Sequence, residues 1–117
     1  MGKKIPYIRI GRGKKEVFYS ASMHANEWIN SVVMMKFIEE FAKAYENNGT
    51  IVYEYSVKDI FESTSIYIAP MVNPDGVDLV LDNISRGSSF YRRALEISED
   101  YSAISFPNGW KANIRRS

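Results

Sequence analysis

The apolar residues of this chain change their spacing along its length, and that spacing predicts which segments are strands and which are helices. Residues 5–10 and 16–21 are short runs rich in branched and aromatic side chains, which is typical of strands. A short connection containing Gly11 and Gly13 separates them, so the simplest pairing is an antiparallel hairpin. A third run, residues 65–72, is mostly apolar and bounded by turn residues, which predicts a buried central strand.

Residues 26–47 have the pattern of one long amphipathic helix. Asn26 is predicted as its N-cap, and the sequence Asn47-Asn48-Gly49 as its end. We expect the apolar face to cover a sheet and thereby to fix Glu27 at the start of the helix. That face comprises Ile29, Val33, Met34, Phe37, Ile38, Phe41, Ala42 and Tyr45.

Shorter helices are predicted at residues 57–62, 76–83 and 90–97, the last capped by Ser88 or Ser89. The sequence Asn73-Pro74-Asp75-Gly76 predicts a tight turn, which by itself explains these residue types. Residues 98–108 are predicted to be an exposed loop. Strands and helices that alternate in this way indicate an α/β fold, and no repeat or linker divides the chain.

Composition limits the functional classes. A chain of 117 residues with 45% apolar and 25% charged residues fits one modest globular domain. With 15 basic and 14 acidic side chains there is no net field to attract nucleic acid or an anionic membrane. The apolar runs are too short to span a bilayer, and no basic-then-apolar leader opens the chain. We therefore expect neither a nucleic-acid nor a membrane partner.

The absence of cysteine excludes disulfides and thiolate metal sites. Any zinc must therefore be bound by nitrogen and oxygen ligands. The same absence does not fix the compartment, so a cytoplasmic location is only the default, and a secreted or wall-associated parent protein remains open.

The candidate chemistry starts at His24, the single histidine, which stands three residues before Glu27 where the second strand gives way to the long helix. An imidazole and a carboxylate at such a junction can converge on one metal ion. The alternative is a histidine hydrogen-bonded at a strand end, beside a carboxylate favoured by the helix dipole. The spacing alone leaves both interpretations open.

Three motifs in this order resemble those of the zinc carboxypeptidases: residues 20–28 (SASMHANEW), residues 70–76 (PMVNPDG) and residues 109–115 (GWKANIR). The match is closest to the bacterial gamma-D-glutamyl-L-diamino acid endopeptidases. Asn26 supports that branch, since animal digestive members carry arginine there. The resemblance implies an α/β/α sandwich whose mixed, mostly buried sheet is flanked by helices. Residues 50–55 could form a short strand by composition, but the resemblance implies a loop with a short helix in this part of the chain.

The resemblance further implies a zinc peptidase that hydrolyses cell-wall stem peptides. His24 and Glu27 would bind zinc together with a later histidine, and a later glutamate would be the general base. Lys111 occupies the place of a basic residue that meets the oxyanion, and Arg115 is the next candidate cation. Lysine lacks the two-pronged donor set of arginine, so the match is looser there. Without the resemblance, this basic stretch reads as a solvated cationic tail.

One histidine cannot complete the two-His, one-Glu set of a zinc peptidase. We therefore expect this chain to be the amino-terminal portion of a longer catalytic domain, with little or no turnover by itself. The alternative is a metal-free remnant or pseudoenzyme that acts as a binding or assembly module. An incomplete sheet with an open edge also favours a homo-oligomer.

Overall fold

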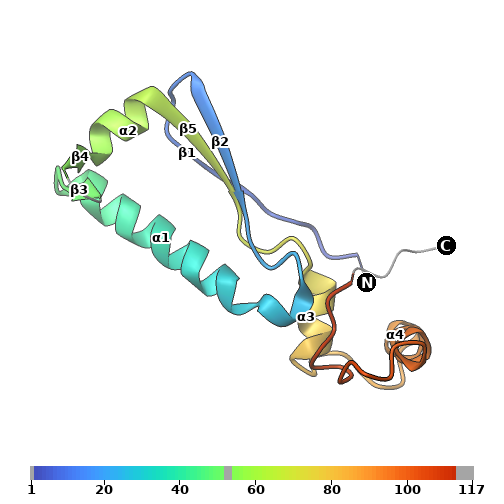
Figure 1. Ribbon diagram of the computed structural model, residues 1–117. Helices are drawn as coiled ribbons and strands as arrows, with labels where there is room; N and C mark the ends of the chain where they lie inside the picture. The colour runs from blue at the N-terminus through green and yellow to red at the C-terminus, as the bar shows by residue number, and fades with distance from the viewer. Residues whose placement is uncertain (1, 52–53, 113–117) are drawn as a thin grey trace. The chain divides into compact units, whose positions relative to one another are not determined.

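The computed structural model describes residues 2–51 and 54–112, and these form two compact units. The sheet unit comprises residues 6–21 and 29–70, apart from 52–53, and the site unit comprises residues 2–5, 22–28 and 71–112. The sheet unit contains the strands and the long helix, and the site unit contains two shorter helices (Figure 1). The predicted α/β class with a mixed sheet is confirmed.

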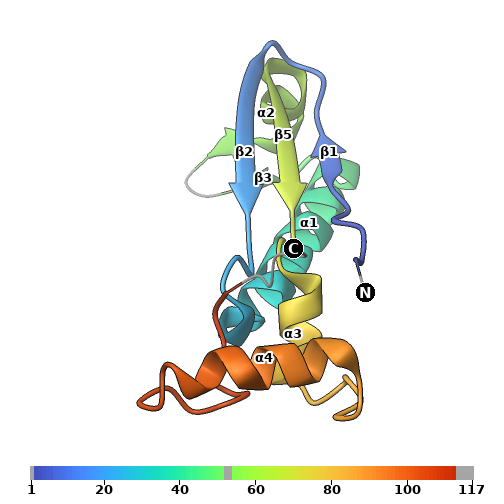
Figure 2. The same ribbon diagram turned by 90° about the vertical axis from the view of Figure 1, so that its right-hand side faces the viewer.

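Three strands make the main sheet: β1 (Ile8–Ile10), β2 (Lys15–Ser20) and β5 (Thr64–Ala69). Their order is β1-β5-β2, with β1 antiparallel and β2 parallel to β5 (Figure 2). One further bond, from the amide of Ala21 to the carbonyl of Ala69 at 3.0 Å, continues the β2 ladder past its end. The central strand is therefore the third run of the sequence, as its apolar composition predicted.

The predicted hairpin between the first two strands is wrong, because β5 lies between them. Ile66 and Ile68 of β5 are 6% and 0% exposed, so the most apolar strand takes the position with two neighbours. All residues of β2, by contrast, are exposed. The local sequence pattern predicted the strands but not which strands pair, because the paired strands are distant in sequence.

The long helix α1 (Ile29–Glu46) is confirmed, but it begins at Ile29 and not at Asn26. A separate turn of 3-10 helix, η1 (Ala25–Glu27), precedes it, so Glu27 does not belong to α1. Only part of the predicted apolar face is buried. Phe41 is 2% exposed, whereas Ile29 and Val33 are 54% and 57% exposed.

The core of the sheet unit joins α1, α2 (Val57–Ser63) and β5 through Phe41, Val57, Ile66 and Ile68. The prediction of α2 is confirmed, and Ser56 caps it by accepting a hydrogen bond from the amide of Asp59. Before α2, the expected loop contains two short paired strands, β3 (Thr50–Ile51) and β4 (Tyr55–Ser56).

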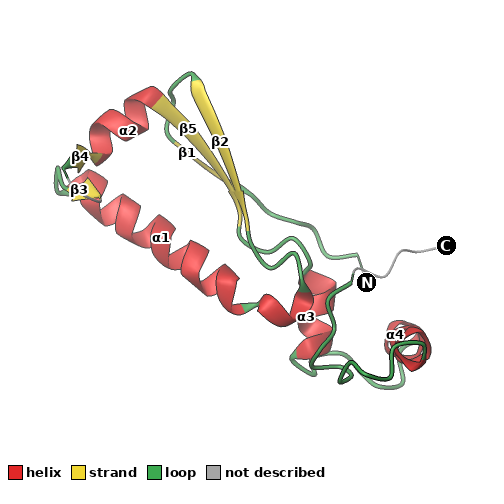
Figure 3. Ribbon diagram, viewed as in Figure 1, coloured by secondary structure: helices red, strands yellow, loops and turns green. Residues whose placement is uncertain are grey.

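The site unit contains α3 (Pro74–Val80) and α4 (Ser89–Glu99). Ser88 caps α4 as predicted, and the residues after α4 form neither helix nor strand up to residue 112 (Figure 3). The core of this unit is a cluster of Ala25, Leu79, Ala94 and Trp110. Among the described residues, the helices are all too short or too polar to cross a bilayer.

Candidate metal site

Residues 22–28 form a tight turn whose two ends are tied together. The amide of Glu27 donates to the carbonyl of His24 at 3.1 Å, and the hydroxyl of Ser22 donates to the carbonyl of Glu27 at 3.3 Å. Ala25, between them, is fully buried in the core of the site unit. The turn is therefore anchored by one buried methyl group, while the side chains of His24 and Glu27 remain about half exposed.

His24 and Glu27 converge within this turn. Nδ1 of His24 lies 3.2 Å from Oε1 of Glu27, and the two side chains are 50% and 45% exposed. At this distance the imidazole and the carboxylate are hydrogen-bonded to each other. Because half of each side chain is exposed, an ion from solvent can reach both.

The pair fits a tetrahedral zinc ion, which binds imidazole nitrogen and carboxylate oxygen at about 2.0–2.2 Å. Two ligands at that distance, separated by a tetrahedral angle, lie about 3.3 Å apart, close to the observed 3.2 Å between donor atoms. A zinc peptidase site takes three protein ligands. Within residues 2–51 and 54–112, no group of three or more His, Cys, Asp or Glu side chains could hold a metal. Among the described residues, the His24–Glu27 pair therefore has no third candidate ligand beside it.

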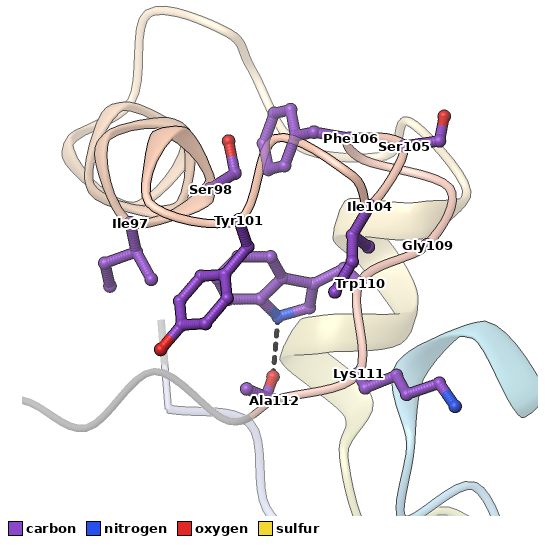
Figure 4. A pocket seen from close by; sticks show the side chains of 10 residues that line it. All are labelled: Ile97, Ser98, Tyr101, Ile104, Ser105, Phe106, Gly109, Trp110, Lys111 and Ala112. Atoms are coloured by element: carbon purple, nitrogen blue, oxygen red, sulfur yellow. Dashed lines mark hydrogen bonds between the residues drawn. The ribbon is translucent and has the colours of Figure 1, made fainter.

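Lys111 lies next to this turn through its backbone. The amide of Ala25 donates to the carbonyl of Lys111 at 3.4 Å, and the amide of Asn26 donates to the carbonyl of Trp110 at 3.0 Å. The side chain of Lys111 is exposed and extends away from the Trp110 ring (Figure 4). The structure therefore brings the backbone of Lys111 against residues 22–28, which carry the two candidate ligands and are called the metal-ligand turn below. Arg115 lies outside the described residues.

Asn73 is a residue for which the family resemblance implied only a scaffolding turn near the site, and sequence analysis missed its long-range bonds. Its side chain is 1% exposed and caps α3 by accepting a bond from the amide of Gly76 at 3.0 Å. Its Nδ2 donates to the carbonyls of Lys111 and Ala112, both at 3.3 Å, and to that of Met23 at 3.5 Å. These partners lie 38 to 50 residues away, so no local pattern could reveal them.

Two carboxamide or carboxylate oxygens of the site unit are buried without a hydrogen-bond partner among the described residues. They are Oδ1 of Asn26, between the two predicted ligands, and Oδ1 of Asp75. The other oxygen of Asp75 accepts a hydrogen bond from the amide of Gly2 at 3.1 Å. These two oxygens are the buried side-chain acceptors that the described residues leave unsatisfied.

A cavity of about 290 Å³ lies beside Trp110, where α4 meets the following loop. Its lining is mostly apolar and includes Ile97, Tyr101 and Ile104, while the indole N–H of Trp110 donates to the carbonyl of Ala112 at 2.6 Å (Figure 4). Sequence analysis predicted only an exposed loop there. Neither His24 nor Glu27 lines this cavity, so it is distinct from the metal-ligand turn.

Comparison with known families shows which family the chain belongs to. The zinc carboxypeptidase model of the M14 peptidases matches residues 1–102, which is most of the chain. The chain belongs to the zinc carboxypeptidase family. Its members are zinc metallopeptidases, so the predicted class of hydrolase is confirmed at the level of the family. The turn that carries His24 and Glu27 lies inside the matched region.

Individual relatives agree with this assignment. The chain is 37% identical over 114 residues to gamma-D-glutamyl-L-diamino acid endopeptidase 1 of Lysinibacillus sphaericus, covering 97% of this chain and 28% of that protein. It is 39% identical over 116 residues to the uncharacterized protein YqgT of Bacillus subtilis, covering 97% of this chain and 30% of that protein. The chain thus spans less than a third of these relatives.

A solved structure supports the fold alone. Bovine thrombin-activatable fibrinolysis inhibitor, in complex with tick carboxypeptidase inhibitor, matches with a TM-score of 0.57 and 17% identity. The match covers 95% of this chain and 26% of that one. The arrangement of strands and helices is therefore that of a carboxypeptidase fold.

Proposed function

We propose that this chain carries the first two zinc ligands, His24 and Glu27, of a peptidase that cleaves gamma-D-glutamyl-L-diamino acid bonds in cell-wall stem peptides. The observation that carries the proposal is the 3.2 Å approach of the two donor atoms within one family-matched turn. The substrate class is supported by the similarity to the Lysinibacillus endopeptidase over 97% of the chain.

When bound, zinc supplies Lewis-acid polarisation of a scissile carbonyl and lowers the pKa of a coordinated water. The residues of this chain have simpler tasks. His24 offers a neutral imidazole nitrogen and Glu27 a carboxylate, while the buried Ala25 between them holds the spacing. Lys111, exposed beside the turn, offers a positive charge to an oxyanion that develops on the substrate.

We further propose that these 117 residues alone do not turn over substrate. The sequence contains one histidine, and the described residues provide no third ligand group near the pair. Two ligands hold zinc less tightly than three and do not include a general base. We therefore expect this chain to bind zinc without catalysing hydrolysis.

The test is calorimetric titration of the purified chain with zinc. We expect one ion per chain, and we expect His24→Ala and Glu27→Gln each to weaken binding by at least about tenfold, the loss typical of removing even an outer partner. Glu99→Gln, at the end of α4, is the control and is expected to leave the affinity unchanged. Unchanged affinity in both ligand variants, or no binding by the unsubstituted chain, would contradict the metal site and favour a metal-free binding module.

Catalysis is tested separately with a gamma-D-glutamyl-L-diaminopimelate peptide. We expect no hydrolysis by the 117-residue chain at any zinc concentration, and chelator-sensitive hydrolysis by a polypeptide that carries this chain together with the remaining family ligands. Chelator-sensitive hydrolysis by the 117-residue chain would contradict the proposal that it is inactive by itself. Hydrolysis of ordinary alpha-linked peptides alone by the longer polypeptide would overturn the substrate class.

A further inference from the structure

The side chain of Asn73 is fully used in the interior of the site unit. It is 1% exposed and contacts three segments that are far apart in sequence: the start of α3, the loop before His24, and residues 111–112. A carboxamide has one acceptor oxygen and two donor hydrogens. The amide of Gly76 uses the oxygen, and the carbonyls of Met23, Lys111 and Ala112 share the hydrogens.

No other side chain of this size can make the same set of bonds. Aspartate would keep the cap on α3 but, when ionised, would face three carbonyl oxygens without a hydrogen to donate. Alanine would leave those carbonyls without the amide and would remove the cap as well. The chemistry at this position therefore requires a donor and an acceptor on one short side chain.

The bonds from Nδ2 reach both sides of the metal-ligand turn. Met23 directly precedes His24, so the bond to its carbonyl restrains the backbone that carries the imidazole. The carbonyl of Lys111 accepts from Asn73 and also from the amide of Ala25, which lies between the two ligands. One buried side chain thus connects the entry to the turn with the segment that presents Lys111.

We propose that Asn73 is a positioning residue that sets the orientation of His24 and holds the Lys111 segment against the metal-ligand turn. This inference rests on the proposed function, because the orientation matters through the zinc that His24 and Glu27 bind. Among the described residues, Asn73 forms its hydrogen bonds with backbone groups and not with the side chains of His24 or Glu27. Its effect therefore passes through the backbone of Met23 and Lys111.

Gly76 provides an independent way to disturb the same link. A Cβ added there would lie 2.6 Å from both Nδ2 and Oδ1 of Asn73 and 2.7 Å from its Cγ. Gly76→Ala therefore displaces the Asn73 side chain without removing it. If Asn73 acts by position, this substitution at a neighbouring residue reproduces the effect of substitution at Asn73.

The experiment compares Asn73→Asp, Asn73→Ala and Gly76→Ala with the unsubstituted chain, with zinc chloride as the probe. Asn73→Asp keeps the helix cap but replaces the donor group with a second acceptor, so it tests the link even if Asn73→Ala fails to fold. We expect each folded variant to bind zinc about tenfold more weakly. Asn47→Ala, which deletes an amide-to-carbonyl bond to Lys43 at the end of α1, is the matched control and leaves the affinity unchanged.

A second readout separates positioning from general stability. His24 is the single histidine, so its side-chain NMR signals are identified without further variants. We expect these signals to move in zinc-free Asn73→Asp and Gly76→Ala but not in Asn47→Ala. Variants that are less stable yet keep both the His24 signals and the zinc affinity would overturn the positioning role. If the unsubstituted chain binds no zinc, the proposed function fails instead, while movement of the zinc-free signals still reports on Asn73.

Discussion

Nδ1 of His24 lies 3.2 Å from Oε1 of Glu27, within a turn of only a few residues. The two groups are positioned by the bond from the amide of Glu27 to the carbonyl of His24, by the buried Ala25 between them, and by the bonds of Ala25 and Asn26 to residues 110–111. This relationship makes the half-site accessible to direct measurement in the short chain.

Zinc should alter the NMR signals of the His24 side chain, and magnesium at equal concentration should not. Magnesium prefers oxygen ligands in octahedral geometry and retains its waters, whereas zinc accepts imidazole nitrogen. The measurement is a pair of titrations followed by histidine ring signals. Glu27→Gln should shift the zinc titration to higher concentration, and identical responses to the two ions would contradict the predicted ligand set.

Lys111→Ala should change neither zinc affinity nor, by more than about 0.5 kcal/mol, the free energy of unfolding. The reason is that Lys111 contacts the turn through its carbonyl, which the substitution keeps.

Trp110→Ala should lower the free energy of unfolding by about 3–5 kcal/mol, because Trp110 is 8% exposed and lies in the core of the site unit. Urea unfolding, monitored by circular dichroism, compares Lys111→Ala with Trp110→Ala. Equal losses of unfolding free energy in the two variants would contradict the view that Trp110 is a core residue and the Lys111 side chain is not.

Phe41→Ala should destabilise the sheet unit by about 3–5 kcal/mol, since its ring is 2% exposed among Val57, Ile66 and Ile68. Val33→Ala is the matched control on the same helix. At 57% exposure, Val33 should contribute within about 0.5 kcal/mol. Denaturant midpoints measured on both variants check this, and a large loss at Val33 would mean that something covers that face in solution.

Gly13→Ala should disturb the start of the sheet. An added Cβ would lie 1.8 Å from the carbonyl carbon of Ser63 and 2.0 Å from the amide nitrogen of Thr64, backbone atoms where α2 ends and β5 begins. We expect a loss of about 1–3 kcal/mol or more in unfolding free energy. Gly87→Ala, whose Cβ would meet nothing closer than 3.8 Å, should be close to neutral, and thermal unfolding distinguishes the two.

The charged face of α1 predicts a specific pH response. The hydrogen bond from Lys43, followed by that from Lys36, lowers the pKa of Glu39, and the same two lysines, with Lys36 first, lower the pKa of Glu40. A carboxylate whose pKa is lowered by folding stabilises the fold above its unfolded pKa and loses that contribution as pH falls through the folded value. These side chains are exposed, so the effect is small and screened by salt.

Stability should therefore fall as pH decreases from about 5 into the acid range, and this fall should be smaller in the double variant Glu39→Gln, Glu40→Gln. Thermal unfolding between pH 3 and pH 7 at low salt measures it. High salt should reduce the difference between the two proteins, and an equally steep fall in the double variant would assign the acid response to other carboxylates.

Sequence patterning predicted the elements well where local physics decides them. The helix at α2, the cap at Ser88 and the buried strand β5 are determined by propensity, capping and apolar runs. The order of the sheet could not be predicted in this way, because β2 pairs with a strand more than 40 residues later. The periodicity of α1 likewise predicts an apolar face but not which part of it is covered, as the exposed Val33 demonstrates.

In the candidate site, too, relationships between residues close in sequence could be predicted and those between distant residues could not. His24 and Glu27 are three residues apart, so their approach could be predicted from spacing and family resemblance. Asn73 is different because its motif has a sufficient local explanation as a helix cap. Its other bonds depend on chain segments brought together only by folding, so the sequence and the family resemblance indicated a scaffolding turn near the site but not the partners of Asn73.

Asn73 recognises main-chain oxygens, and this has an evolutionary consequence. Replacing the side chains of Met23, Lys111 or Ala112 leaves the carbonyls that it binds in place. Selection can therefore change the charge and shape of the side chains at those three positions while the backbone bonds that hold residues 22–28 and 111–112 together are kept.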